Sequence, residues 1–341
     1  MNPFSVQTLG SEGDVEKLNL DAQTRYLAGG TNLVDLMKHQ IETPVSLVDL
    51  SEWEGASEIE KTGNGYRIGA MVTNTELANF AWREPSLSVL SQALLSGATV
   101  QLRNRATTGG NLLQRTRCYY FYDTAKPCNK REPGTGCSAL TGMNRIHAIF
   151  GTSEQCIATH PSDMAVALMA LNASVSVKTA MGKKRDIALR EFYCTPGETP
   201  ERENVLEQGD LITSVYIPAG TRGTQHYYKV RDRASYAFAL VSVAAALELN
   251  EETIHSVSLS FGGVGTIPWY PKKALEILQG NKFSVQLLEK AIDAELADAK
   301  TFGSNDFKPG LLRRVFLSVM LSLAQRQKKQ PGHEGALYEN R

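Results

Sequence analysis

The segment at residues 118–137, CYYFYDTAKPCNKREPGTGC, restricts the possible fold more than any other part of the chain. It holds three of the five cysteines, and its twenty residues include two prolines, two glycines and five charged side chains. Proline removes a backbone donor and glycine loses more entropy on ordering, so both interrupt regular structure. We therefore expect a loop that is neither an ordinary helix nor a core strand, and its thiols need an explanation.

The chain length predicts more than one folding unit. At 341 residues the chain exceeds the roughly 250–300 residues at which a single core stops growing. Helical and strand patterns occur in both halves, so we expect an α+β protein. We place a domain boundary at 222, with subdomains 1–55 and 56–222 before it, a second domain at 223–328, and a loose polar tail at 329–341.

Charge and composition exclude several classes of function. Lys and Arg total 36, and so do Asp and Glu, which argues against a broad surface for nucleic acid or anionic membrane. The longest apolar run, 237–247, is shorter than the ~20 residues that span a bilayer. The N-terminus has no basic or apolar signal region, so nothing marks this chain itself for export. An odd number of cysteines in a reducing compartment favours metal or catalytic roles over disulfides.

Several elements carry clear local signals. Thr73 and Glu76 have the spacing of a capping box before a short helix, and Ser162 is placed to cap a helix over 163–171. The alternating segment 173–179 predicts a half-buried strand. After residue 223, strands are predicted within 226–230, 239–249 and 254–265, followed by helices at 284–296 and 311–326.

Two glycine-rich turns each lead into a helical pattern. Residues 25–38 contain Gly29 and Gly30, and residues 103–115 contain Gly109 and Gly110. Paired glycines let backbone N–H groups approach an anion, and a following helix adds a favourable dipole. Taken alone, a glycine pair before a helix is more often a plain turn than an anion-binding site. Two of them together, each with hydroxyl or amide side chains, favour one ligand that carries two phosphates.

The cysteine spacing leaves two interpretations open. Cys118, Cys128, Cys137 and Cys156 lack the close pairs that zinc sites and common iron–sulfur motifs use. They could be isolated, inert, buried thiols. Their polar, glycine- and proline-rich surroundings instead favour a loop organised around a metal centre. Cys194 stands apart and is interpreted as a packing residue without a ligand.

Five segments occur in an order that resembles one known family: LAGGTNLVDLMK, QLRNRATTGGNLLQRTRC, ATHPSDMAVAL, GDLITSVYIP and YYKVRDRASYAFALVSVAAAL. They are similar to the FAD-binding subunits of the molybdenum hydroxylases, the xanthine oxidase family, over residues 1–328. The cysteine-bearing insert at 115–160 looks most like that of bacterial periplasmic aldehyde oxidoreductases, which have three subunits. In those flavin subunits four cysteines hold a 4Fe-4S cluster, and a related insert occurs in 4-hydroxybenzoyl-CoA reductase.

The resemblance implies a fold and a set of binding residues. The fold is a two-part FAD-binding domain of the PCMH (vanillyl-alcohol-oxidase-like) type, followed by a CO-dehydrogenase-flavoprotein-like C-terminal α+β domain. The implied FAD-binding residues are Arg25, Tyr26, Leu27, Ala28, Gly29, Gly30, Thr31, Asn32, Leu33, Thr107, Gly110, Asn111, Asp163 and Lys229. The implied cluster ligands are Cys118, Cys128, Cys137 and Cys156.

Some of these residues have simpler local explanations. Asp163 would also be favourable as a carboxylate at a helix N-terminus, and the two roles can coexist. Lys229 alone would suit a solvated strand end. The aromatic run Tyr119, Tyr120, Phe121 and Tyr122 would shield the cluster or contact another subunit, although such runs usually pack within their own domain.

The resemblance also implies the function. No hydrolytic motif or phosphate-binding P-loop is present, and no residue of this chain is expected to be catalytic. The chain would carry electrons from a 2Fe-2S small subunit through FAD to an external acceptor, while a molybdenum-cofactor large subunit oxidises an aldehyde to an acid. Alternatives are a related hydroxylase of N-heterocycles or aromatic acyl-CoA, or a noncatalytic scaffold with a structural metal clip. The complex would be a heterotrimer, either exported to the periplasm with a signal-bearing partner or cytoplasmic.

Overall fold

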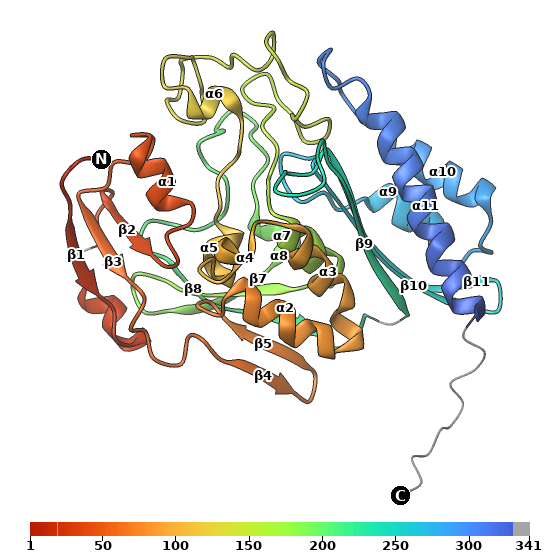
Figure 1. Cartoon of the computed structure of the whole chain (residues 1–341), viewed down its shortest axis with the longest axis horizontal. Coiled ribbons are helices and arrows are strands. Elements are labelled where there is room, and N and C mark those ends of the chain that lie inside the picture. Colours follow the sequence, from red (N-terminus) through yellow and green to blue (C-terminus); the bar gives the residue numbers. More distant parts are fainter. Residues whose placement is uncertain (19, 222, 330–341) are drawn as a thin grey trace, which may run out of the picture.

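The computed structural model describes residues 1–18, 20–221 and 223–329. These residues form three sheets with helices packed around them (Figure 1). The predicted boundary at 222 falls on a residue outside this description. Of the predicted tail, Lys329 is instead the last residue of a long helix, and 330–341 lie outside the described residues.

A small parallel sheet opens the chain and carries the first glycine turn. Its strands have the order β1 (Ser5–Thr8), β3 (Ser46–Asp49), β2 (Thr24–Leu27), with the 3₁₀ helix η1 (Glu12–Lys17) between β1 and β2. Parallel strands need a crossover, and here α1 (Leu33–Lys38) connects β2 to β3. The glycine turn lies between the end of β2 and the start of α1.

A five-stranded antiparallel sheet forms the centre of the first half. Its order is β4 (Ile59–Thr62), β5 (Gly65–Gly69), β8 (Leu211–Pro218), β6 (Ser174–Lys178), β7 (Lys184–Ala188). The accompanying helices are α2 (Asn74–Arg83), η2 (Pro85–Leu87), α3 (Ser88–Ser96), α4 (Val100–Arg103), α5 (Thr108–Leu112), α7 (Asp163–Ala170) and α8 (Leu189–Phe192). Helix α7 is buried from Met164 to Ala170, and it packs against α3, β10 and β11.

The C-terminal half is a three-stranded antiparallel sheet covered by helices. The strand order is β11 (Thr253–Gly262), β10 (Val241–Asn250), β9 (Thr224–Val230). The helices are α9 (Lys272–Leu278), α10 (Val285–Leu296) and α11 (Lys308–Lys329). Leu312, Val315 and Phe316 of α11 join a core separate from that of the first half, as their helical spacing predicts.

The cysteine insert at 115–160 lies above the first half in Figure 1. It is mostly irregular, but the single helical turn α6 (Tyr119–Tyr122) falls within a stretch expected to be loop. Cys118, Cys128 and Cys156 form a third buried cluster with the fully buried Phe121, and Cys137 packs against it. Further along the insert, Ile149 and Phe150 join the C-terminal core, so the insert bridges both halves.

The last helix and the loop before it hold this bridge in place. Asn144 Nδ2 donates to Phe302 O at 2.6 Å, and Asn305 Nδ2 donates to Ala148 O at 3.1 Å. Lys308, which has no exposed surface, donates through Nζ to His147 O at 2.7 Å and also to Gly263 O.

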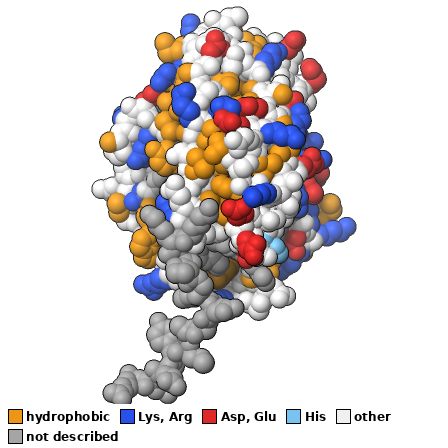
Figure 2. Space-filling view, turned by 90° about the vertical axis from the view of Figure 1, so that its right-hand side faces the viewer, with side chains coloured by type: hydrophobic (Ala, Val, Ile, Leu, Met, Phe, Trp, Pro, Cys, Tyr) orange, Lys and Arg blue, Asp and Glu red, His pale blue; other side chains and the backbone are white. Residues whose placement is uncertain are grey.

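Figure 2 shows the face on the C-terminal side, where Lys and Arg side chains alternate with Asp and Glu around hydrophobic groups. Within the described ranges, no helix is long and apolar enough to cross a membrane.

Candidate functional site

The first glycine turn lies at the edge of a large cleft. Gly30 has φ +71°, a conformation that favours glycine, and it directs the chain from β2 into α1. At Gly29 a Cβ atom would lie only 1.8 Å from the backbone oxygen of Arg105. Only glycine fits here because the second turn approaches this closely.

Backbone hydrogen bonds fix the second glycine turn. Gly109 N donates to Ala70 O at 2.8 Å, and Thr108 N donates to Val72 O at 2.8 Å. Thr107 caps α5, because its Oγ1 accepts from Gly110 N at 3.2 Å. The second turn is therefore held rigidly against the first, and both line one cleft, although Gly29 and Thr107 are 78 positions apart in the chain.

The cleft between the turns has a volume of about 420 Å³, within the range of small-molecule and cofactor sites. Leu206, Gly209 and Asp210 line its far side. Most of the predicted FAD-binding residues line it: Arg25, Tyr26, Ala28, Gly29, Gly30, Thr31, Asn32, Leu33, Thr107 and Gly110. Leu27 and Asn111 are not among the residues that line it, and Asn111 accepts through Oδ1 from Ser162 Oγ at 2.6 Å.

The side-chain amide of Asn32, in the cleft, offers a hydrogen-bond donor to an anionic ligand. Asn32 Oδ1 accepts from Arg115 N at 2.8 Å, which fixes the orientation of the amide. Its Nδ2 is buried and has no hydrogen-bond partner in the described part of the chain. A buried donor without an acceptor is costly, so this N–H group is suited to a ligand oxygen. The residues present therefore fit a dinucleotide with a pyrophosphate.

Asp163 and Lys229 meet away from this cleft. Lys229 Nζ lies 2.7 Å from Asp163 Oδ2, and the two side chains are only 4% and 11% exposed. Tyr227 OH donates to Asp163 Oδ1 at 2.6 Å, and burial raises the pKa of this tyrosine well above its ordinary value. Lys229 is thus a buried ion-pair partner instead of a solvated charge at a strand end. Asp163 also lines a smaller cavity with Arg117, Phe238 and Gly263.

The four predicted cluster cysteines converge on one small cavity. Cys118, Cys128, Cys137 and Cys156 all line it, together with Tyr120 and Phe121 from the aromatic run. Cys128 and Cys137 form an antiparallel bridge through their backbones. His147 Nε2 lies 3.0 Å from Cys118 Sγ. Cys194 lies outside this group, as expected for a residue without a ligand role.

Burial keeps the thiols of Cys118 and Cys156 protonated at neutral pH. It raises the pKa of Cys118 to about 12 and that of Cys156 to about 11, although the Lys130 cation opposes the shift at Cys156. A metal centre that takes them would release protons. Nowhere in the described ranges do three His, Cys, Asp or Glu side chains approach closely enough to hold a single metal ion. A cubane cluster places its thiolates on four separate corners, so it needs wider spacing than one ion.

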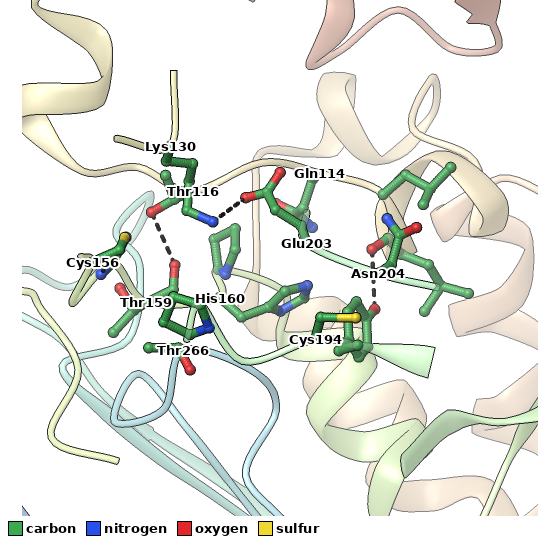
Figure 3. A pocket seen from close by; sticks show the side chains of 16 residues that line it. Gln114, Thr116, Lys130, Cys156, Thr159, His160, Cys194, Glu203, Asn204 and Thr266 are labelled. Atoms are coloured by element: carbon green, nitrogen blue, oxygen red, sulfur yellow. Dashed lines mark hydrogen bonds and ion pairs between the residues drawn. The ribbon is translucent and has the colours of Figure 1, made fainter. Parts of the chain in front are cut away.

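Another cavity lies between the cleft and the cysteine cavity and shares lining residues with both; we call it the junction cavity (Figure 3). It shares Leu113, Glu203 and Asn204 with the cleft. It shares Thr116, Lys130, Cys156 and Ala158 with the cysteine cavity. In Figure 3, Cys156 and Asn204 lie on opposite sides, and a dashed line joins Lys130 to Glu203.

Sequence reasoning missed the charged residues of this region. No local pattern assigns a role to Glu42, Arg115, Lys130 or Glu203, because each pairs with a residue far away in the chain. The only local signal is Arg115 itself, which ends the second glycine segment directly before the insert.

Family models match both halves of the chain. The FAD binding domain in molybdopterin dehydrogenase matches residues 12–220, and the CO dehydrogenase flavoprotein C-terminal domain matches residues 226–323. Together with the cleft between the glycine turns, these matches define an FAD-binding flavoprotein with the predicted two-domain α+β fold.

Similar proteins narrow this class. The chain is 50% identical to the aldehyde oxidoreductase FAD-binding subunit PaoB of Escherichia coli (strain K12), over 87% of this chain and 90% of that protein. It is 26% identical to the carbon monoxide dehydrogenase medium chain of Afipia carboxidovorans, over 92% of this chain and 91% of that protein. Its fold is similar to that of a chain in a solved structure of Cu,Mo-CO dehydrogenase, with a TM-score of 0.73 and 22% sequence identity. The match covers 96% of this chain and 100% of that chain.

The chain belongs to the molybdenum hydroxylase family as an FAD-binding medium subunit. It is therefore an oxidoreductase subunit, and its relatives are medium subunits of complexes with several subunits. This membership disfavours the noncatalytic scaffold considered above.

Proposed function

We propose that this chain is the FAD- and 4Fe-4S-containing electron-transfer subunit of a molybdenum-dependent aldehyde oxidoreductase. The observation that carries the proposal is the meeting of four cysteines from one insert at a cavity beside the cofactor cleft. The 50% identity to an aldehyde oxidoreductase subunit supports the aldehyde as substrate class.

The two glycine turns would hold the pyrophosphate of FAD. Backbone groups at Gly29, Gly30 and Gly110 can approach the ligand closely because no side chain intervenes. Asn32 Nδ2 would donate to a phosphate oxygen, and Asp163 with Lys229 would bind nearer the flavin end. Bound FAD supplies the ability to accept electrons singly and release them in pairs.

The four cysteines would hold a 4Fe-4S cluster as thiolates. Phe121 and Tyr120 line the same cavity and would shield a cluster bound there. The domain boundary at 222 would separate this cofactor-binding half from a C-terminal half that supports the insert through Asn305 and Lys308.

The partners would be a molybdenum-cofactor large subunit and a 2Fe-2S small subunit, in a heterotrimer. Aldehyde oxidation takes place on the large subunit in this scheme, and the chain passes the electrons to an external acceptor. The chain alone should therefore oxidise no aldehyde. A related enzyme of N-heterocycles is the second candidate, but the nicotine 6-hydroxylase medium subunit is only 24% identical over 92% of this chain.

Counting cofactors in the complex tests this proposal. We expect the chain, expressed with its neighbouring subunits, to contain FAD and iron beyond what the small subunit's clusters hold. Cys128→Ser should lose about four irons, since a missing ligand releases or degrades the cluster. The matched control Cys194→Ser should keep them, because Cys194 lies outside the cysteine cavity. Flavin with no excess iron would refute the cluster, and absence of flavin would refute the cofactor assignment.

A further inference from the structure

Five charged side chains of alternating sign connect the first glycine turn to the cysteine insert. Arg25 Nε lies 3.4 Å from Glu42 Oε2, and Arg115 Nη1 lies 2.6 Å from Glu42 Oε1. Arg115 Nε lies 2.7 Å from Glu203 Oε2, and Lys130 Nζ lies 3.0 Å from Glu203 Oε1. We call this series the charge chain.

The charge chain connects two cavities. Arg25, Glu42, Arg115 and Glu203 all line the cofactor cleft. Lys130 lines the junction and cysteine cavities and follows Cys128 by two residues. The side chains of Lys130 and Arg115 are only 10% and 19% exposed, so solvent screens their interactions less than it screens surface pairs.

The positive charge of Lys130 compensates the excess of carboxylates on the cleft wall. Among the residues that the structure describes, the wall carries four carboxylates and two cations: Glu42, Glu203, Glu207 and Asp210, with Arg25 and Arg115. Arg185 neutralises Asp210 from behind at 2.6 Å. Without Lys130, the Glu203 carboxylate would share Arg115 with Glu42 and would repel an anionic pyrophosphate. Lys130 is therefore the cation that makes this part of the wall acceptable to the ligand.

The position of Lys130 depends on the fold of the insert. Asn129 N donates to Gly136 O at 2.8 Å, and Cys128 and Cys137 flank this turn as a bridged pair. Thiolates bound to one cluster would tie both ends of the turn and fix the backbone that carries Lys130. An insert without a cluster keeps its hydrogen bonds, among them Lys130 Nζ to Pro200 O at 2.7 Å and Asn129 Nδ2 to Gln155 Oε1 at 2.8 Å. It loses the covalent tie between Cys128 and Cys137, so Lys130 would leave Glu203 more often.

We propose that the Lys130–Glu203 ion pair couples the two cofactor sites, so that the insert with its cluster binds FAD more tightly than the empty insert. This inference rests on the proposed function, because it takes the four cysteines as cluster ligands. The coupling is reciprocal by thermodynamic necessity, so bound FAD also stabilises the loaded insert.

The test measures FAD affinity of the full-length chain in two states. The chain is purified anaerobically, stripped of FAD, and titrated with FAD by fluorescence quenching, both with a reconstituted cluster and after iron removal. We expect about tenfold tighter binding with the cluster, within the usual range of coupling between sites.

Two variants distinguish this coupling from a general loss of structure. Glu203→Gln removes the repulsive charge, so its iron-free form should bind FAD more tightly than iron-free wild type, and the ratio between states should approach one. Lys130→Met should lower the affinity of the loaded chain to that of the iron-free wild type. Lys126→Met removes an exposed lysine from the same insert and should leave the ratio unchanged.

Equal FAD affinity in the loaded and iron-free wild type would overturn the inference, as would an unchanged ratio in Glu203→Gln. A chain that takes up no iron would overturn it together with the proposed cluster. A chain that binds no FAD in either state would instead refute the proposed function itself. If Lys130→Met fails to load iron, Glu203→Gln decides, because Glu203 lies outside the insert.

Discussion

At Gly29 the two glycine turns touch through backbone atoms alone. A Cβ at this position would lie 1.8 Å from Arg105 O, a distance that no rotamer change can relieve because both partners are main chain. The separation of the turns sets the width of the cleft. Residue 29 is therefore where a single methyl group changes the binding site most directly.

We expect Gly29→Ala to push the turns apart and to lower FAD affinity at least tenfold, with a loss of stability of about 1–3 kcal/mol from overpacking. Fluorescence titration with FAD and thermal unfolding measure the two effects. Gly63→Ala is the control, since nothing lies within 4 Å of its added Cβ. Unchanged FAD affinity in Gly29→Ala would show that the turns do not form the cradle.

The residues that sequence could identify are those with local causes. Glycine pairs, capping hydroxyls and a cysteine-rich loop can be recognised in the sequence because each forms a pattern with residues close to it in the chain. The pairing of Lys229 with Asp163 could not be predicted, because the two residues are 66 positions apart. Each also had a local explanation of its own, Asp163 at a helix N-terminus and Lys229 at a strand end. Lys130 and Glu203 escaped for the same reason.

At the scale of elements, helix α2 shows how far local signals reach. Thr73 Oγ1 accepts from Glu76 N at 3.2 Å, and Glu76 Oε2 accepts from Thr73 N at 3.0 Å, which confirms the predicted capping box. Ser162 likewise caps α7 as predicted. The strands β9 to β11 and the helices α10 and α11 also occur where periodicity placed them.

Thr73→Ala should lower the free energy of unfolding by about 1 kcal/mol, because Glu76 N loses its acceptor at the start of α2. Urea unfolding followed by circular dichroism measures this loss. Thr73→Ser keeps the hydroxyl and should retain most of the stability. Equal midpoints for all three proteins would mean that the cap contributes nothing.

Helix α9 and the turn α6 are among the short elements that escaped prediction. Helix α9 has seven residues, and no side chain caps its N-terminus at Pro271, so it carries no start signal. The turn α6 lies between cysteines in a segment that composition marked as irregular. Both depend on tertiary packing: Ala274 and Leu278 of α9 enter the C-terminal core, and Phe121 of α6 enters the core of the insert.

At the scale of the whole molecule, folding carries a pH dependence. Burial lowers the pKa of His160 to about 4, compared with roughly 6.5 in an unfolded chain. Between these values the unfolded state binds a proton that the folded state does not. Stability is therefore lost as the pH falls from 6.5 to 4, by roughly 3 kcal/mol at most from this group.

His160→Asn should flatten this acid loss relative to wild type while changing stability at pH 8 much less. Denaturant unfolding at several pH values between 4 and 8 gives the slope of the unfolding free energy against pH for wild type and for the variant. His255→Asn, at an exposed position, should leave the wild-type slope intact. Parallel curves for wild type and His160→Asn would show that another group controls the acid loss.

The bridge between the insert and the C-terminal half has a consequence for synthesis on the ribosome. The residues that form a core with Ile149 and Phe150 are translated more than ninety positions later. Lys308, which donates to His147 O, is translated later still. While the chain emerges, residues 115–160 cannot reach their final structure. We therefore expect any metal centre on the four thiols to reach its final surroundings only when most of the chain has been translated.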